Sequence, residues 1–219
     1  MNAYVNKNQS KRENICSTSI FLAKKKYMLN VHNSEGVQYD TPKLKITGIE
    51  AVRTSTPAIV RDKFKKAYKI MMESNEEQLQ AFVSEFRAQF AELPPESVSF
   101  PRGVTELHKW TDDKTPFKKG VPIHVRGAIL YNMLLKKYKL PDEPLNDGSK
   151  VKFCYLMSPN PVGSHVIAFP EFLPKEFGLH KYIDRDVQFE KTFMDPLKLV
   201  SDTIGWDLEH VTTLESFFG

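Results

Sequence analysis

The sequence predicts an α+β fold, in which a β-rich N-terminal segment precedes a mainly helical part that holds a small β element. Alternating apolar residues within 19–47 predict the first strands. Two helical stripes of apolar residues then fill the stretch between Pro57 and Pro94. Short strand candidates return only after residue 150, between further helical segments.

The first strands form a predicted hairpin. Residues 27–31 alternate toward the turn sequence His32-Asn33-Ser34-Glu35-Gly36, after which residues 37–39 return. Residues 43–46 predict a third extended piece.

Two helices are predicted next. Ser55-Thr56-Pro57 offers a cap and a proline at the first helical position of one helix. Asn75 can cap the other, with Gln78 three residues on, and Pro94 stops it. The predicted core positions are Ile59, Val60, Phe64, Tyr68, Met71 and Met72 in the first helix, and Leu79, Phe82, Val83, Phe86 and Phe90 in the second.

The second half alternates irregular and regular segments. Residues 94–121 are charged and punctuated by Pro and Gly, which predicts a surface excursion. Pro122 opens a helix through about Lys137, and residues 151–157 and 165–169 are strand candidates. Helix returns near Ile183, is interrupted by Pro196 and ends around Gly205. The inward positions predicted for the helix after Pro122 are Val125, Ile129, Leu130, Met133 and Leu134.

Composition places the chain among folded proteins with a real core. The 219 residues are 41% hydrophobic and 26% charged, which suits one sizeable domain or two small ones. The formal charge is +4, but residues 1–30 and 118–152 each carry +5 while residues 182–219 carry −5. Cys16 and Cys154 have no metal or redox spacing, and the sequence predicts no signal peptide or membrane span. A reducing cytosol is therefore the expected compartment.

The most informative local element is Ala23-Lys24-Lys25-Lys26-Tyr27 at the start of a predicted strand. Three adjacent cations with a phenol are typical of nucleic-acid binding, because lysines neutralise phosphates and the phenol adds a flat hydrogen-bonding group. The alternative is a solvated basic edge that protects a strand from aggregation. The residues that follow in the chain favour the first interpretation.

Together with later segments, this element resembles the family B DNA polymerase of T-even-type tailed bacteriophages, in the stretch that leaves the palm and enters the thumb. The matching segments, in order, are Lys24 to Tyr27, Pro42-Lys43-Leu44-Lys45-Ile46-Thr47-Gly48-Ile49-Glu50, Arg53-Thr54-Ser55-Thr56-Pro57, Pro122-Ile123-His124-Val125-Arg126-Gly127-Ala128, Gln188-Phe189-Glu190-Lys191-Thr192-Phe193 with Asp195-Pro196-Leu197, and Leu214-Glu215-Ser216-Phe217-Phe218. The resemblance covers essentially the whole chain. It implies the C-terminal part of the palm at residues 1–56, the thumb at 57–208 and a clamp-binding tail at 209–219.

The resemblance also implies DNA contacts. In that family a Lys-Lys-Arg-Tyr element checks base-pair geometry in the minor groove of the primer–template duplex. Carried over, Lys25 and Tyr27 are the groove contacts and Lys24 supports them. The minor groove suits this task because its acceptors are nearly independent of sequence. Lys26 stands where the family has Arg, which keeps the charge but loses the planar fork.

Further cations are implied as phosphate contacts: Lys45 and Arg53 near the palm–thumb junction, and Lys118, Lys119, Arg126, Lys136 and Lys137 on the thumb. For any single one of these, a solvated helix-face cation is the competing interpretation. His124 sits among apolar positions and is expected to be a structural histidine.

The chain end carries Leu214, Phe217 and Phe218 at i, i+3 and i+4, which favours one helical turn that docks into a partner's groove. The resemblance names the partner as the sliding clamp, and the alternative is a tail packed back on its own domain. Asp184 and Asp186 are not expected to bind metal, because they lack the family's glycine and tight hairpin.

The function expected from the resemblance is that of a C-terminal fragment or subunit of a phage replicative DNA-directed DNA polymerase. Such a chain grips the primer–template duplex and binds the sliding clamp, while the catalytic carboxylates and their Mg²⁺ belong to a missing or separate N-terminal polymerase chain. Alone it is expected to be inactive and to hold no cofactor or metal, in the cytoplasm of the bacterial host. The alternatives are a non-enzymatic DNA- and clamp-binding module and a truncated polymerase.

Overall fold

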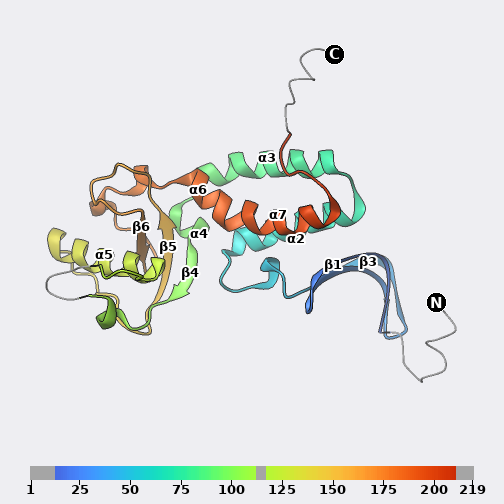
Figure 1. The fold of residues 1–219 in the computed structure, drawn as a ribbon, viewed down its shortest axis with the longest axis horizontal. Coiled ribbons are helices and arrows are strands. Elements are labelled where there is room, and N and C mark those ends of the chain that lie inside the picture. The colour runs from blue at the N-terminus through green and yellow to red at the C-terminus, as the bar shows by residue number, and fades with distance from the viewer. Residues whose placement is uncertain (1–12, 112–116, 211–219) are drawn as a thin grey trace, which may run out of the picture.

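The computed structural model describes residues 13–111 and 117–210, and these form an α+β fold as the sequence predicts (Figure 1). The strands are β1 Asn14–Ala23, β2 Lys26–Ser34, β3 Val37–Thr47, β4 Phe100–Gly103, β5 Lys150–Tyr155 and β6 Val166–Phe169. The α-helices are α2 Ala58–Glu73, α3 Glu76–Glu92, α4 Pro95–Val98, α5 Ile123–Tyr138, α6 Arg185–Phe189 and α7 Asp195–Ile204. A π-helical turn, Glu190–Met194, joins α6 to α7, and short 3₁₀ turns include Glu50–Val52.

The first sheet is an antiparallel meander in the order β1-β2-β3. The predicted hairpin is β2 and β3, and it turns at Glu35 and Gly36. Residues 43–46 are not a separate extended piece, because they continue β3 and pair with residues 28–31 of β2. The third strand is instead β1, which pairs with the opposite edge of β2.

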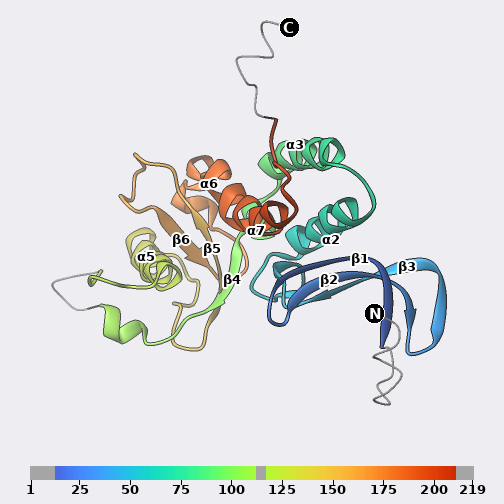
Figure 2. The ribbon, with the colours of Figure 1, turned by 45° about the vertical axis from the view of Figure 1, so that its right-hand side comes forward.

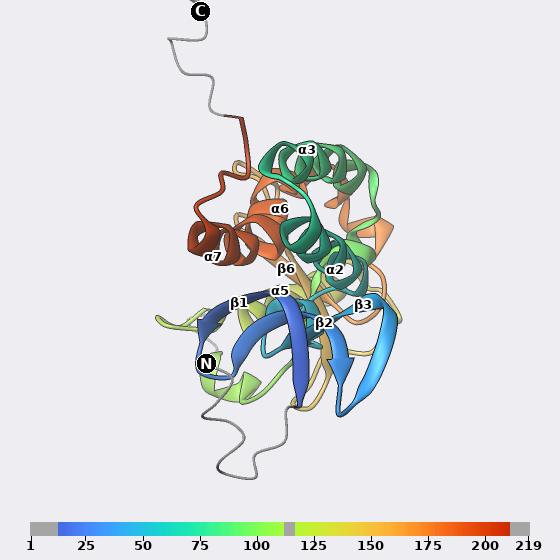
Figure 3. The ribbon, with the colours of Figure 1, turned by 90° about the vertical axis from the view of Figure 1, so that its right-hand side faces the viewer.

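Each face of this sheet has a different environment, because side chains alternate along a strand. Ile20 and Met28 are buried against the helices, and Ile46 packs beside them. The face that carries Phe21 and Tyr27 is more open, and Phe21 is 64% exposed. Viewed from the side, the strands lie beneath α2 and α7 (Figure 3).

Helices α2 and α3 follow the predicted stripes, since every predicted core position except Ile59 and Phe82 is buried. The Asn75 side chain accepts a hydrogen bond from the Gln78 amide at 3.0 Å, which confirms the predicted cap of α3. The expected start of α2 is wrong by one residue. Pro57 is the cap residue and not the first helical residue, because its carbonyl already accepts the Arg61 amide at 3.0 Å.

An aromatic cluster holds the helices together. The Phe193 ring centroid lies 4.9 Å from those of both Phe64 and Phe86, and Phe189 lies 5.1 Å from Phe90. The segment from α6 through α7 therefore closes the core formed by α2 and α3 (Figure 2). Pro196 sits in the first turn of α7 directly after the π-helical turn, and Gly205, at φ +71°, ends that helix as predicted.

A second core lies around the antiparallel sheet β4-β5-β6 and helix α5. The prediction that residues 94–121 form only a surface excursion is wrong, because Phe100 to Gly103 pair with β5 as strand β4. Met133, predicted to point inward, is 43% exposed. Helix α5 packs closely on β6 at Gly127, where a β-carbon would come within 2.6 Å of the Ala168 amide nitrogen.

Gln188 links the two cores. Its fully buried side chain accepts the Tyr155 amide of β5 at 3.1 Å and donates to the Val98 carbonyl of α4 at 2.7 Å. Within residues 13–111 and 117–210, none of the helices has the length and apolar character needed to cross a bilayer.

Candidate nucleic-acid interface

The basic element lies at the tight turn between β1 and β2. Lys24 and Lys25 form the turn, Lys26 begins β2, and all three side chains are exposed. The Lys25 backbone has φ +65°, a left-handed conformation that is uncommon for a residue with a β-carbon. Three ammonium groups therefore project from one corner of the first sheet.

Gly48, just after β3, supports this turn from below. A β-carbon on residue 48 would collide with the main-chain carbonyl oxygen of Lys25, and Gly48 itself has φ +66°. Only glycine combines that backbone conformation with such a close approach. The turn that carries the lysines is thus positioned by contact with the end of β3.

Tyr27 lies next to this turn on the more open face of the sheet. Its ring centroid is 5.8 Å from that of its cross-strand neighbour Phe21. Two residues along the sheet, Leu29 pairs with the exposed Lys45. Lys24, Lys25, Tyr27 and Lys45 therefore lie together at this corner of the sheet, whereas Lys26, on the alternate face of β2, lines a depression with Pro196 and Leu199.

A depression runs from this turn toward the second core. Its first part, about 240 Å³, is lined by Lys26, Gly48, Glu50 and Pro196 among others. The adjoining part, about 360 Å³, shares Glu50 and Pro196 and reaches the start of α5. We call the two parts together the junction cleft. The remaining charged or titratable groups on its wall are Arg102, His124, Tyr155 and Lys191.

Arg102 and Lys191 are cations of the junction cleft that the sequence did not assign to DNA binding. The Arg102 guanidinium donates to the main-chain carbonyls of Ser55, at 2.9 Å, and Pro101, at 2.8 Å. Lys191 pairs with Asp195 at 2.8 Å and remains exposed. Arg102 was missed because its segment gave no strand signal. Lys191 stood within a matched segment without a role of its own.

His124 lies at the first turn of α5 and lines the junction cleft. Burial, together with the nearby Arg102 charge, lowers the pKa of its imidazole below the ordinary value. The ring is half-buried, with its centroid 6.3 Å from the Phe153 ring. Near neutral pH it is therefore an uncharged group in a cationic wall.

The other predicted cations are distributed over three places. Arg53 forms a 2.8 Å ion pair with Glu50 beside the junction cleft. Lys118 and Lys119 precede α5, and the Arg126 guanidinium stacks on the Phe117 ring at 4.7 Å. Arg126 is half-buried, and within the described residues its buried Nε has no hydrogen-bond partner.

Lys136 and Lys137 are in the last turn of α5, whose C-terminal end points away from the first sheet (Figure 1). At 1.5 Å per residue they lie about 20 Å along the helix from its first turn. The structure does not bring these two lysines to the junction cleft.

Two further groups of residues were considered from the sequence, an acidic pair and the predicted clamp contacts. The Asp184 carboxylate accepts the Val187 amide at 2.9 Å and caps α6, while Asp186 lies exposed in the first turn of the same helix. The predicted clamp contacts Leu214, Phe217 and Phe218 lie outside the described residues.

The chain is similar in sequence to two known proteins. It is 31% identical over 201 residues to the DNA-directed DNA polymerase of Enterobacteria phage T4, and 34% identical over 200 residues to that of Escherichia phage RB69. No protein-family model matches it. The matches cover 90% and 89% of this chain but 22% of each polymerase, so the chain spans about a fifth of the length of these relatives. The chain is therefore similar to a part of the DNA-directed DNA polymerases of these two phages.

Proposed function

We propose that this chain is the C-terminal, duplex-holding part of a phage replicative DNA polymerase. The observation that carries the proposal is the exposed lysine turn beside Tyr27, which opens onto a depression with cations on its wall, in a chain related to DNA polymerases. Under this proposal residues 1–56 belong to the palm and residues 57–208 to the thumb of a family B enzyme.

The β1–β2 turn would supply the contacts to the minor groove. Lys25 lies in the turn and Tyr27 is the second residue of β2, so a lysine ammonium and a phenol can reach the same groove from one corner of the sheet. Groove acceptors are shared by A·T and T·A pairs, and a lysine donor there tests pairing more than sequence. Lys24 and Lys26 would neutralise neighbouring phosphates.

The junction cleft would follow the duplex backbone. Lys26, Arg102 and Lys191 come from three separate segments and lie along one depression. Arg102 is anchored by two carbonyls, which fixes its guanidinium in place before DNA arrives. Glu50 also lines the cleft, and its ion pair with Arg53 offsets its repulsion of phosphate.

The remaining activities of the enzyme would depend on other components. The carboxylates that hold Mg²⁺ for nucleotidyl transfer would come from an N-terminal polymerase segment, and this chain alone would be inactive. Leu214, Phe217 and Phe218 would bind the sliding clamp. The assembly would work in the cytoplasm of the bacterial host.

Duplex binding provides the direct test. Fluorescence anisotropy of a labelled primer–template across a KCl series should show weaker binding for the double variant Lys25→Ala and Tyr27→Ala. Lys65→Ala is the matched control, because Lys65 is an exposed lysine of α2 that pairs with Asp62. An affinity of the double variant equal to that of wild type at every salt concentration would exclude the minor-groove role.

Primer extension separates a polymerase part from a binding module. This chain, the catalytic polymerase segment and the mixture of the two should be assayed in parallel, and synthesis is expected only when both are present. Synthesis by this chain alone would contradict the proposal, and absence of synthesis in the mixture, with intact duplex binding, would favour the non-enzymatic module.

The clamp contact needs its own measurement. Removal of residues 214–219 should abolish binding to the immobilised clamp and leave duplex affinity unchanged. Retained clamp binding would exclude the tail as the docking segment.

A further inference from the structure

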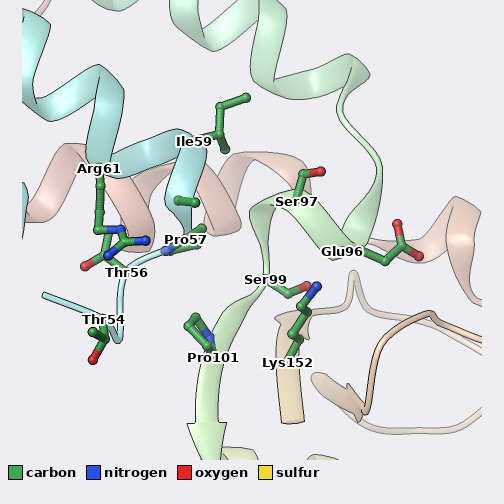
Figure 4. Close-up of a pocket in the computed structure, with 11 residues that line it drawn as sticks. Thr54, Thr56, Pro57, Ile59, Arg61, Glu96, Ser97, Ser99, Pro101 and Lys152 are labelled. Carbon is green, nitrogen blue, oxygen red and sulfur yellow. The ribbon is translucent and has the colours of Figure 1, made fainter. Parts of the chain in front are cut away.

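A second basic pocket lies where the start of α2 meets α4 and the β4–β5 pair (Figure 4). Its volume is about 410 Å³. The polar or charged side chains among its lining residues are Thr54, Thr56, Arg61, Glu96, Ser97, Ser99 and Lys152. We call it the α2 pocket.

The α2 pocket and the second part of the junction cleft lie on opposite faces of the β4–β5 pair. Side chains alternate along a strand, and Pro101 pairs with Lys152 while Phe100 pairs with Phe153. Pro101 and Lys152 line the α2 pocket, whereas Phe100 and Phe153 line the junction cleft. The two sites share Thr56, but the cations of the α2 pocket, Arg61 and Lys152, do not line the junction cleft.

Two cations enter the α2 pocket from different elements. Arg61 comes from the first turn of α2 and Lys152 from β5, and Figure 4 shows them on opposite walls. Both side chains are half-buried, and neither has an acidic partner within 4.0 Å in the described part of the chain. Partial removal of two cations from water without an anion is unfavourable, so the arrangement favours an anionic ligand.

Glu96 is the acid on this wall, and its charge is partly engaged elsewhere. Its carboxylate interacts electrostatically with the Arg185 guanidinium. Burial lowers the pKa of Arg185, and the negative charge of Glu96 partly opposes that shift. The Glu96 Oε1 also accepts the Leu173 amide at 3.4 Å. Arg61 and Lys152 consequently outnumber the acid within the pocket.

Uncharged donors complete the α2 pocket. Thr56 is only 6% exposed and lines the pocket, where its hydroxyl can donate a hydrogen bond. No side chain within residues 13–111 and 117–210 caps α2. The amides of Ala58, Ile59 and Val60 therefore precede the first helical bond, which Arg61 makes to Pro57. Amide donors and the helix dipole at such a terminus favour a tetrahedral oxyanion.

We propose that the α2 pocket binds a phosphate group. Arg61 and Lys152 would provide charge-assisted hydrogen bonds from two sides, and the Thr56 hydroxyl and the first amides of α2 would donate to the remaining oxygens. The phosphate can belong to a nucleic-acid backbone that reaches this face or to a small phosphorylated ligand, and the two sources share the same chemistry.

The test is a titration of the ¹⁵N-labelled full chain, at fixed ionic strength, with inorganic phosphate, thymidine monophosphate and a primer–template duplex in separate arms. The amides of Ala58 and Ile59 should shift with at least one of the three. The double variant Arg61→Gln and Lys152→Gln should bind at least about tenfold more weakly, because it loses two charge-assisted hydrogen bonds.

The matched control is the double variant Lys65→Gln and Lys150→Gln. These exposed lysines lie on the same helix and the same strand as Arg61 and Lys152, and they should leave the shifts unchanged. Shifts with phosphate or the monophosphate identify a small ligand, and shifts with the duplex alone identify a backbone phosphate. Absence of shifts in all three arms, or equal binding by the Arg61 and Lys152 variant, would overturn the proposal.

Phosphate binding by the α2 pocket does not require the proposed minor-groove contacts Lys25 and Tyr27. The double variant of Lys25 and Tyr27 alters none of the residues that line the α2 pocket, so it should retain the phosphate-dependent shifts. Loss of duplex binding and loss of phosphate binding can therefore be assigned to different sites.

Discussion

The main-chain carbonyl of Lys25 occupies the space that a β-carbon of residue 48 would need, so the lysine turn closes over Gly48. The contact joins residues from the β1–β2 turn and the end of β3, and it fixes the corner of the sheet from which the lysines project. The position of a proposed DNA contact thus depends on a glycine, which has no side chain of its own to contact DNA.

Gly48→Ala should lower the free energy of unfolding by roughly 2–4 kcal/mol, because a left-handed conformation and a backbone collision add together. Gly178→Ala is the matched control, since Gly178 has φ +64° and a β-carbon added there would meet no other atom within 4 Å. Urea unfolding measures both. Equal losses in the two variants would show that the Lys25 carbonyl moves away freely.

Lys191→Gln should make duplex binding less dependent on salt, because one phosphate contact is lost. The slope of log K against log salt concentration should become less steep by about one. Lys198→Gln is its control on the neighbouring helix. Lys191–Asp195 and Lys198–Asp202 are both i,i+4 pairs at 2.8 Å, but only Lys191 lines the junction cleft. The same slope for both variants would place the duplex elsewhere.

His124 should make the protein less stable in acid. Its folded pKa is lowered by burial and by Arg102, so the unfolded chain binds more protons at pH values just below the ordinary histidine pKa of about 6.5. The stabilisation should therefore be fully present at pH 8, and the free energy of unfolding should fall as the pH drops below the ordinary histidine pKa.

His124→Gln should flatten this pH dependence, as measured by urea unfolding at pH 8 and pH 5.5. Lys191, Glu50 and Tyr155 also line the cleft and stay in place in the variant. His165→Gln, at an exposed position, should leave the difference between the two pH values unchanged. If the His124 variant loses as much unfolding free energy between pH 8 and pH 5.5 as the wild type does, other groups cause the pH dependence.

Gln188→Met should destabilise the protein by about 2–4 kcal/mol, because it leaves the Tyr155 amide and the Val98 carbonyl without their partner. Gln80→Met is the control, since Gln80 is 8% exposed and donates a single bond to the Asp207 carbonyl. Thermal unfolding of both variants compares them. A loss no larger than that of the Gln80 variant would show that Gln188 does not hold the two cores together.

Much of the fold follows from local sequence signals. The period of the apolar residues predicts α2 and α3, the Asn75 cap is confirmed, and Gly205 ends α7. These signals act through neighbours within one or two turns, so no distant contact is needed to interpret them. The three lysines and Tyr27 are contiguous, and the exposure of the lysines at a strand entrance was predictable for the same reason.

Other features depend on contacts between distant segments. Phe100 to Gly103 form a strand because β5 lies beside them, and Met133 is exposed because α5 meets β6 through Gly127. The junction cleft unites Lys26, Arg102 and Lys191, and the α2 pocket unites Arg61 with Lys152, although these residues are far apart in the chain. Local residue order thus specifies the helices and the lysine turn, whereas the packed fold selects which cations share a cleft, because side chains from separate elements meet only once both cores are packed.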